Sequence, residues 1–475
     1  MKTLIKYLAY VLIISSFFRI IPIITGIVYH ESIISFIITF LISILLGLGL
    51  LWYSKTIKDK ETGLSLTKGL MLVALSFIIL PLIGAVSFLP SFDYNLIDAT
   101  FESISGFTTT GFTLYSSLDN LPKSLLMWRA ETQWMGGIGI IMVFLFIFSK
   151  LTAHTYTIIT GAESSAKSSL ALYQAQGFPE KLEPGLKKTT ANILIIYGGY
   201  TILGIILLLF TGMSIFNAVG MTFTSLSTGG FTLNDNFYSN DFQLIVLGIL
   251  MIIGSISFIA HNKLLQKKFK EFLFSFEKNI FLFILLTAII LVVIVYRDIR
   301  VVLFELISAF TTTGYSITNI SLLPHIFIFL IMIGMIIGGS IASTAGGMKV
   351  FRIFYLIKSI PWMLKKLSSP PKAVIPLKIK NKIIEEENLL IVQIFVFCYI
   401  LILVLGTIIF MLFGNNFLDS SFQIASGLGT VGLQTMELAG INWVCKFVLM
   451  IAMLLGRLEL FPLLILIRSI FKKSF

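Results

Sequence analysis

The sequence predicts an all-α integral membrane protein of ten transmembrane helices, built as four repeats in a pseudo-fourfold arrangement after a two-helix N-terminal prefix. Of its 475 residues, 57% are hydrophobic and only 12% are charged, and one glycine-centred motif occurs four times between long apolar runs. A soluble domain carries about 25% charged residues. Most of this chain is therefore expected to lie in a lipid bilayer.

Ten apolar runs are each long enough to cross the hydrocarbon core of a bilayer, which needs about 20 helical residues. Lipid cannot satisfy backbone polar groups, so these runs must be helices, and shorter apolar stretches must be enclosed in protein or face water. The first run is longer than a signal-peptide core and lacks a small-residue cleavage site, so we expect a retained helix. Six of the runs, in chain order, are Leu4–Tyr29, Ile33–Trp52, Leu70–Leu89, Asn192–Phe210, Ile280–Tyr296 and Leu389–Phe413.

The net charge of +12 is distributed as the positive-inside rule requires. With the N-terminus placed inside, most Lys and Arg residues fall in terminal segments and inner loops, and only Lys123, Arg297 and Arg300 fall in outer loops. This distribution predicts a cytoplasmic N-terminus and gives no reason to expect a nucleic-acid partner. Cys398 and Cys445 are too few for a disulfide framework or a thiolate metal site.

Four short stretches align on a single glycine, and each lies between two predicted spans. Each stretch is a short semi-apolar helix that ends in a Thr-containing tripeptide, followed by the glycine and then by an aromatic residue or Leu. The stretches are 101–113, 221–232, 304–316 and 422–434, and their glycines are 119, 84 and 118 residues apart. The repeating unit is thus span, re-entrant hairpin, span. We divide the chain into a prefix (1–60) and repeats 61–155, 156–265, 266–385 and 386–475.

Such a hairpin has the chemistry of a cation filter. Rings of backbone carbonyls can replace the hydration shell of a monovalent cation, glycine permits the positive φ that aligns them, and Thr adds a hydroxyl at the inner end. The preceding short helix directs its negative C-terminal end toward the ion. One such motif alone is more often an ordinary helix-packing contact, but four copies predict a pore. The expected potassium-binding residues are Thr109, Thr110, Gly111, Phe112, Thr228, Gly229, Gly230, Phe231, Thr312, Thr313, Gly314, Tyr315, Thr430, Val431, Gly432 and Leu433.

Acidic residues in the predicted outer loops and hairpin starts are expected to attract cations to the outer mouth. They include Asp93, Asp98, Glu102, Asp119, Asp235, Asp241, Asp298, Glu305, Asp419 and Glu437.

Over essentially its whole length the sequence resembles the Trk, Ktr and HKT superfamily of potassium transporters, most of all the bacterial Trk-type membrane subunit. The resemblance rests on the four filter stretches, Gln133–Gly139, Ala162-Glu163, Glu180–Pro184 and Gly456–Glu459. It implies potassium selectivity, since the first filter residue is serine in some sodium-passing relatives and is Gly111 here. It also implies a homodimer and a cytoplasmic nucleotide-binding ring as partner. Gly229, Val431 and Leu433 depart from the family pattern.

A run of small residues, Gly338–Gly347, interrupts the apolar segment after the third hairpin and is expected to split that span into two half-helices. A nucleotide-binding loop is excluded here because the Walker spacing fails. Arg457 is a permanent charge in the last span, where it either pairs with Glu459 or backbone carbonyls as a structural contact, or lies near this loop. The resemblance supports a gate in which the loop blocks the pore below the filter. The gate residues we expect are Gly338, Gly339, Ser343, Thr344, Gly346, Gly347, Lys349 and Arg457.

No nucleophile and base pair indicates catalysis, and the function we expect is channel-like potassium uptake. Two alternatives remain. A symporter would couple potassium to sodium or protons, and its flux would follow the second gradient. The ion-binding subunit of an ATP-driven pump would copurify with an ATPase, because this chain has no phosphorylatable Asp-Lys-Thr-Gly-Thr motif.

Overall fold

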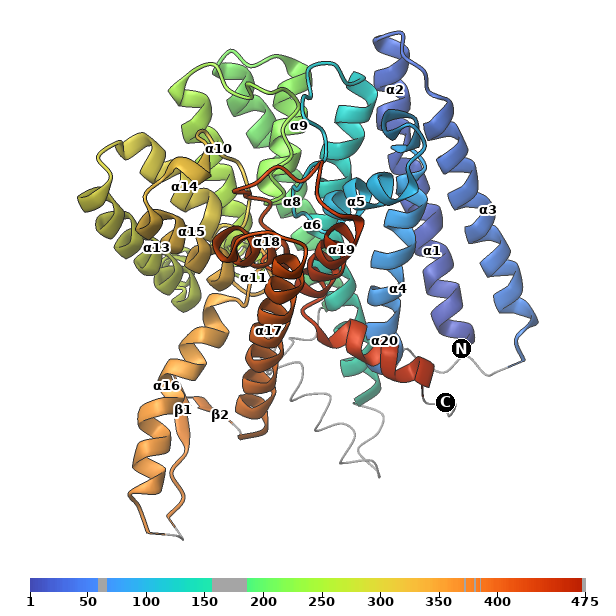
Figure 1. The fold of residues 1–475 in the computed structure, drawn as a ribbon. Helices are drawn as coiled ribbons and strands as arrows, with labels where there is room; N and C mark the ends of the chain where they lie inside the picture. Colours follow the sequence, from blue (N-terminus) through green and yellow to red (C-terminus); the bar gives the residue numbers. More distant parts are fainter. Residues whose placement is uncertain (59–65, 156–185, 371–372, 380–381, 385, 472–475) are drawn as a thin grey trace.

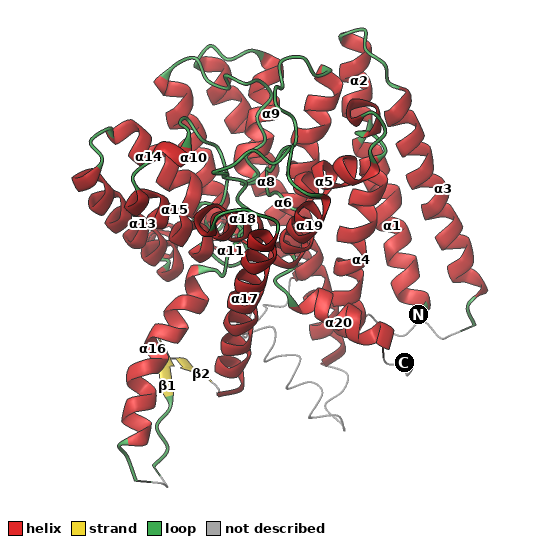
Figure 2. Ribbon diagram, viewed as in Figure 1, coloured by secondary structure: helices red, strands yellow, loops and turns green. Residues whose placement is uncertain are grey.

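Nearly all regular structure in this protein is helical (Figure 2). The computed structural model describes residues 1–58, 66–155, 186–370, 373–379, 382–384 and 386–471. Within these residues, strands occur only as a small antiparallel ladder, β1 (Leu377–Ile379) with β2 (Lys382–Ile384). The ladder lies alongside α16 (Val350–Leu367), below most of the helical bundle in this view (Figure 1). Apart from this ladder, the all-α prediction is confirmed.

Six helical stretches are long and apolar enough to cross a membrane. They comprise α1 and α2 (Lys2–Phe18 and Ile20–Val28, one stretch with a break at Arg19), α3 (Ile34–Thr56), α4 (Leu66–Ala85), α8 (Leu186–Phe210), α13 (Phe276–Val295) and α17 (Glu386–Leu412). Helices α1, α2 and α3 form the prefix at one side of the bundle, where α1 and α3 pack together (Figure 1). The side chains on the outer faces of these helices are mostly exposed Ile, Leu and Phe, as lipid contact requires.

Besides the break at Arg19, three of the predicted spans are interrupted by a loop or a sharp bend. The sequence predicted only one of these three interruptions. As expected, α15 (His325–Ile337) ends at Gly338 and α16 begins after Lys349. In addition, α10 (Asp241–Ser255) and α11 (Phe258–Leu265) meet at 99°, and α19 (Trp443–Arg457) and α20 (Phe461–Phe471) meet at 109°. Counting each bent pair as one span raises the six candidates to eight among the described residues. Helix α6 (Lys123–Thr155) and the α15–α16 segment occupy the other two predicted spans.

Four short helices of equal length lie inside the bundle. They are α5 (Leu96–Phe107), α9 (Ile215–Leu226), α14 (Ile299–Phe310) and α18 (Phe417–Leu428), each of 12 residues. At 1.5 Å per residue they measure about 18 Å and cannot cross the bilayer. A side chain caps each N-terminus, from Asn95, Ser214, Asp298 and Asn416 respectively. Helix α5 packs against α4 and α6, and α18 packs against α17 and α19, which is the span, hairpin, span arrangement.

The prefix is attached to the first repeat through buried polar contacts. Helix α2 packs on α6, and the Glu31 carboxylate accepts hydrogen bonds from the backbone amides of Lys123 and Ser124 at 2.6 and 2.8 Å. Arg19, at the break between α1 and α2, is fully buried, and its guanidinium lies 5.1 Å from the centre of the Trp128 ring. This cation–π contact joins the prefix to α6.

Candidate functional site

The four short helices end in the same backbone motif. In each, a threonine amide bonds to the carbonyl three residues back, and the next amide bonds to the carbonyl five residues back. This is a Schellman cap, which usually places glycine in the left-handed conformation. Here the left-handed residues are Thr109, Thr228, Thr312 and Thr430, with φ of 54°, 52°, 57° and 51°. A β-branched residue in this region costs about 1–2 kcal/mol, and strain of this kind clusters at functional sites.

Two residues after each strained threonine, the filter glycine also has positive φ. The values are 90° for Gly111, 79° for Gly230, 92° for Gly314 and 91° for Gly432. The sequence predicted this conformation for the glycines but not for the threonines. Alternation of left-handed residues turns successive peptide planes. The surrounding bundle holds the turn because the residues from the left-handed threonine to the residue after the glycine are buried, except Gly111 and Gly314, which are partly exposed.

The contacts of these glycines close a ring in the order of the chain. A Cβ atom built on Gly111 would strike the carbonyl oxygen of Gly229 in the second repeat. In the same way Gly230 faces Thr313, Gly314 faces Val431, and Gly432 faces Thr110 of the first repeat. Each glycine therefore abuts the carbonyl that precedes the next glycine. The structure thus brings all four predicted filter segments together around one axis.

At the inner end of this ring lie the threonine hydroxyls. Within the described residues, those of Thr109 and Thr430 are buried and have no hydrogen-bond partner in the protein. The Thr312 hydroxyl accepts a bond from the Gly346 amide at 2.7 Å, and Thr228 bonds to the carbonyl of Ser227. Unpartnered buried hydroxyls are rare because they cost free energy. Two of them beside a ring of carbonyls form a set of oxygen atoms that suits a dehydrated cation.

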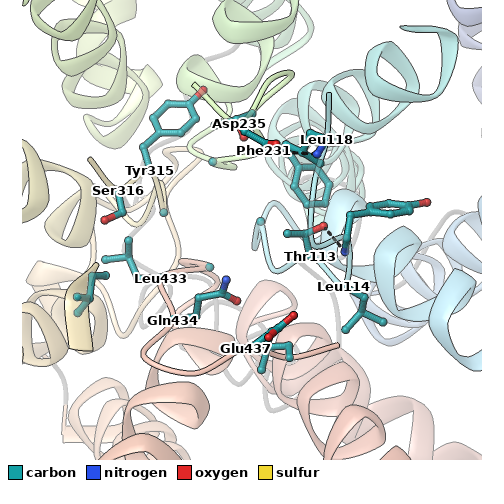
Figure 3. Close-up of a pocket in the computed structure, with 18 of the residues that line it drawn as sticks. Thr113, Leu114, Leu118, Phe231, Asp235, Tyr315, Ser316, Leu433, Gln434 and Glu437 are labelled. Atoms are coloured by element: carbon teal, nitrogen blue, oxygen red, sulfur yellow. Dashed lines mark hydrogen bonds between the residues drawn. The ribbon is translucent and has the colours of Figure 1, made fainter. Parts of the chain in front are cut away.

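On the outer side the ring opens into a cavity of about 640 Å³. All four repeats line it with their filter glycines and the segments that follow them, and Figure 3 shows lining residues from each repeat around the cavity. Asp235 and Glu437 are among the lining acids. Asp235 accepts hydrogen bonds from the Ser117 hydroxyl at 2.7 Å and from the Leu118 amide at 2.9 Å, so it also ties the first repeat to the second.

Glu102 and Glu305 are not part of the outer mouth, which corrects the prediction for these two acids. Both side chains are fully buried. Glu102 accepts bonds from the Leu114 amide at 3.1 Å and from Arg129 at 2.8 Å. Glu305 accepts from the Ile317 amide at 2.8 Å and from the Ser316 hydroxyl at 2.9 Å. Their carboxylates fix the backbone that follows the filter.

Among the described residues, only the first repeat adds an arginine to this contact. Arg129 also donates to the Thr232 carbonyl at 3.1 Å, and its guanidinium lies 4.0 Å from the centre of the Phe231 ring. The ion pair of Glu102 and Arg129 therefore joins the filter segments of the first and second repeats. Sequence reasoning missed it because the two residues lie on separate helices, 27 positions apart.

Glu102→Gln should destabilise the protein by about 3 kcal/mol or more, because it leaves Arg129 buried without a counter-charge. Thermal unfolding of the detergent-solubilised protein measures this effect. Glu305→Gln is the matched control, since Glu305 has no arginine and Gln423 stands naturally at the corresponding position of the fourth repeat. Its expected loss is below about 1 kcal/mol. Equal losses in the two variants would contradict the role of the ion pair.

The loop between α15 and α16 lies directly against the inner end of the ring. The Gly346 amide bonds to Thr312, and a Cβ on Gly346 would strike the Thr430 hydroxyl. Further along the loop, the Ser340 amide donates to the Ser255 carbonyl at 2.9 Å, and the Ala342 carbonyl accepts from the Phe258 amide at 2.9 Å. The loop therefore occupies the side opposite the cavity.

The other predicted gate residues all belong to this loop or touch it. The two ends of the loop meet where Gly338, with φ of 69°, faces Gly346 and Gly347, while Gly339 packs on Ser255. The Ser343 hydroxyl donates to the Ser340 carbonyl at 2.5 Å. Thr344 donates its hydroxyl to the carbonyls of Leu226 and Gly254 at 3.0 and 2.9 Å. The Lys349 ammonium donates to the Ala345 carbonyl.

Arg457 links the loop to the first repeat. Its guanidinium donates to the Thr344 carbonyl at 2.6 Å and to the Gly136 and Gly137 carbonyls at 2.7 and 3.2 Å. Of the two structural pairings considered from the sequence, the carbonyls are the ones found, since Glu459 pairs with Arg352 instead. The loop thus contacts residues of the second, third and fourth repeats, and Arg457 connects it to the first. Sequence reasoning assigned the gate to the third and fourth repeats alone, because contacts between distant segments leave no mark in the chain.

Several supporting residues carried no signal in the predicted filter motif. Ser308 and Ser426 accept hydrogen bonds from the filter amides of Gly314 and Gly432 at 3.1 and 3.0 Å. Ser105 donates to the Phe112 carbonyl at 2.7 Å. All three serines stand six residues before the filter glycine of their repeat. This regular spacing is visible in the aligned sequences, but the prediction of the filter did not use it. The motif pieces Ala162-Glu163 and Glu180–Pro184 lie outside the described residues.

Comparisons with known proteins agree on one family. The family model described as "TrkH: Cation transport protein" matches residues 32–302 and 278–474. An uncharacterised cation transporter of Methanocaldococcus jannaschii is 32% identical, over 96% of this chain and 93% of its own length. The Trk system potassium uptake protein TrkH of Escherichia coli is 29% identical, over 95% of each chain. The crystal structure of the potassium transporter TrkH from Vibrio parahaemolyticus matches with a TM-score of 0.84 and 25% identity, over 99% of each chain.

Proposed function

The chain belongs to the TrkH family of cation transport proteins, and from that premise we propose that it takes up potassium ions across the cell membrane through the ring of four glycine motifs. It is a multi-pass membrane transporter and not an enzyme. The observation that carries the proposal is the closed order of contacts from Gly111 through Gly230 and Gly314 to Gly432. A ring of this kind offers backbone carbonyls from four sides to one ion.

The proposed path starts in the outer cavity, where Asp235 and Glu437 favour cations over anions. The ion exchanges its water for the carbonyls of the ring and for the inner threonine hydroxyls. An inside-negative membrane potential supplies about 2.3 kcal/mol per charge per 100 mV, enough to accumulate potassium without chemistry in this chain. Potassium is therefore the transported ion and no further cofactor is proposed.

The loop below the ring is proposed as the gate. With Gly346 bonded to Thr312 and Arg457 bonded to Thr344, the loop blocks the way from the filter to the inner side. Displacement of the loop opens the path. Its glycines support this role, since Gly338 and Gly347 hold positive φ and stand where a hinge requires freedom.

We place the N-terminus in the cytoplasm, the protein in the cell (inner) membrane as a homodimer, and a cytoplasmic nucleotide-binding ring on its inner face. The N-terminus and the described end of α20 lie at the same end of the bundle as α16 and the β1–β2 ladder (Figure 1). Helix α16 carries Lys365 and Lys366 in its last turn, so the inner end of the protein is basic, as the positive-inside rule requires.

Flux of potassium and sodium into vesicles that contain the purified protein tests the function. We expect potassium to enter in preference to sodium when each is the sole permeant cation, with uptake that follows the membrane potential alone. Equal passage of both ions would refute the assignment. A rate that depends on a sodium or proton gradient would favour the symporter instead, and copurification of an ATPase would favour the pump subunit.

A further inference from the structure

The second repeat lacks the side chain that supports the filter in the other repeats. The residue before the filter glycine is Thr110 in the first repeat, Thr313 in the third and Val431 in the fourth, but Gly229 in the second. The Thr110 hydroxyl bonds to Thr108 at 2.8 Å, and Thr313 bonds to Thr311 at the same distance. Val431 belongs to an apolar cluster that includes Ile331. Gly229 can make neither kind of contact.

Gln133 of helix α6 fills this place from outside the repeat. A Cβ built on Gly229 would strike the side-chain amide of Gln133, so the glutamine occupies the space of the missing side chain. Its Nε2 donates to the Gly229 carbonyl at 2.6 Å, and its Oε1 accepts from the Phe231 amide at 3.0 Å. The amide thus brackets Gly230 on both sides.

The second repeat also lacks the serine contact seen elsewhere. Where Ser308 and Ser426 accept a bond from the filter glycine amide, the corresponding Thr224 pairs its hydroxyl with the Tyr315 hydroxyl at 2.5 Å. The Gly230 amide reaches only the Thr224 carbonyl, at a long 3.4 Å. Gln133 therefore supplies the hydrogen bonds that hold this quarter of the ring.

The corresponding positions on other spans are apolar. Gly136, Gly254 and Gly456 each abut the carbonyl of a pore-helix end, of Phe107, Leu226 and Leu428 respectively, so they mark equivalent points of their spans. Three residues before these glycines stand Gln133, Met251 and Met453, and all three are buried. A polar residue thus stands at this point only in the span that supports the second repeat, among the three compared.

We infer that Gln133 is a positioning residue that sets the cation preference of the filter, by holding the Gly229 carbonyl and the Phe231 amide in place of a side chain that the second repeat lacks. The inference rests on the proposed function of the ring. The Gly229 carbonyl is also the group that Gly111 abuts. A shift of this oxygen therefore disturbs the first and second repeats together, and selectivity depends on the number and field strength of such carbonyls.

The test compares the order of permeation of Li⁺, Na⁺, K⁺, Rb⁺ and Cs⁺ through vesicles that contain full-length protein. Gln133→Met keeps the volume but removes both hydrogen bonds, and the preference for potassium over sodium should fall about fivefold or more. Gly229→Thr alone places a side chain where Gln133 lies, and it should fold poorly or pass little current. Ile245→Met, on an exposed position of α10, is the matched control and should behave as wild type.

Rescue separates positioning from general damage. The double variant Gln133→Met with Gly229→Thr combines a methionine, as stands at the equivalent position 251 of α10, with a threonine, as precedes the filter glycine in the third repeat. Ser227 then offers a hydroxyl at the position of Thr311. We expect it to fold and to regain most of the wild-type order. A Gln133→Met protein with the wild-type order, or a folded double variant no more selective than Gln133→Met, would overturn the inference. A wild type that does not prefer potassium would refute the proposed function, while the difference between wild type and Gln133→Met would still decide the role of Gln133.

Discussion

Gly111→Ser is expected to lower the preference for potassium over sodium at least about tenfold, which corresponds to about 1.4 kcal/mol. Gly111 has φ of 90°, and a Cβ there would strike the Gly229 carbonyl of the next repeat. A side chain therefore strains its own backbone by about 1–3 kcal/mol and pushes a ring carbonyl away from its place. With one carbonyl displaced, the ring no longer surrounds a dehydrated potassium ion from four sides and discriminates less between the two ions. Reversal potentials or competing fluxes in vesicles measure the ratio.

Gly414→Ser provides the control for backbone strain. Gly414 has nearly the same conformation, with φ of 89°, but a Cβ there would meet no atom within 4 Å. It precedes α18 and lies outside the ring. We expect Gly414→Ser to lose some stability and to keep the wild-type ion preference. If both variants lost selectivity equally, backbone strain outside the ring would be enough to lower it. The contact between Gly111 and the Gly229 carbonyl would then not explain the effect.

Arg457→Ala should raise potassium flux through vesicles that contain the protein without any partner. The guanidinium holds the loop through the Thr344 carbonyl at 2.6 Å, and a hydrogen bond to a charged group contributes about 1.5–3 kcal/mol. The bond exists only in the closed arrangement of the loop. Its loss therefore raises the ratio of open to closed protein by roughly ten- to a hundredfold. The rate of potassium entry into vesicles, followed with a potassium-sensitive dye, measures the change.

Two further variants identify the source of this effect. Arg468→Ala removes a positive charge from an exposed position on the next helix, α20, and it should leave flux unchanged. Arg457→Lys keeps the charge but cannot reach the Thr344 and Gly136 carbonyls at once, so its flux should lie between those of wild type and Arg457→Ala. Unchanged flux in a folded Arg457→Ala protein would eliminate this loop contact as part of the gate.

Local sequence was sufficient for several features that depend on one segment, although not for the bends between α10 and α11 and between α19 and α20. The apolar runs predicted the helices, and the small residues of Gly338–Gly347 predicted a broken span. The glycine motif predicted the positive φ at Gly111 and its three counterparts. These features follow from hydrophobic length and from the steric limits of single residues, so they can be read along the chain.

Contacts between distant segments could not be predicted from the sequence. Glu102 has the same acidic character as Asp98 in the chain, yet one is buried against Arg129 and the other pairs with Lys446 near the surface. The left-handed conformation of Thr109 and its counterparts opposes the preference of a β-branched residue, and only the surrounding packing enforces it. Local preference therefore gives the wrong answer where tertiary contacts supply more free energy than the strain costs.

The sequence by itself determined that four glycine hairpins lie between membrane spans. The tertiary structure alone decided how they meet: each filter glycine abuts the next carbonyl in chain order, Gln133 completes the repeat that lacks a side chain, and Arg457 joins the loop to α6. The physical reason is range. Hydrophobicity and backbone conformation are properties of neighbouring residues. The ring, in contrast, closes where Gly432 meets Thr110 of the first repeat, and Arg457 donates to a carbonyl 321 positions away in the chain.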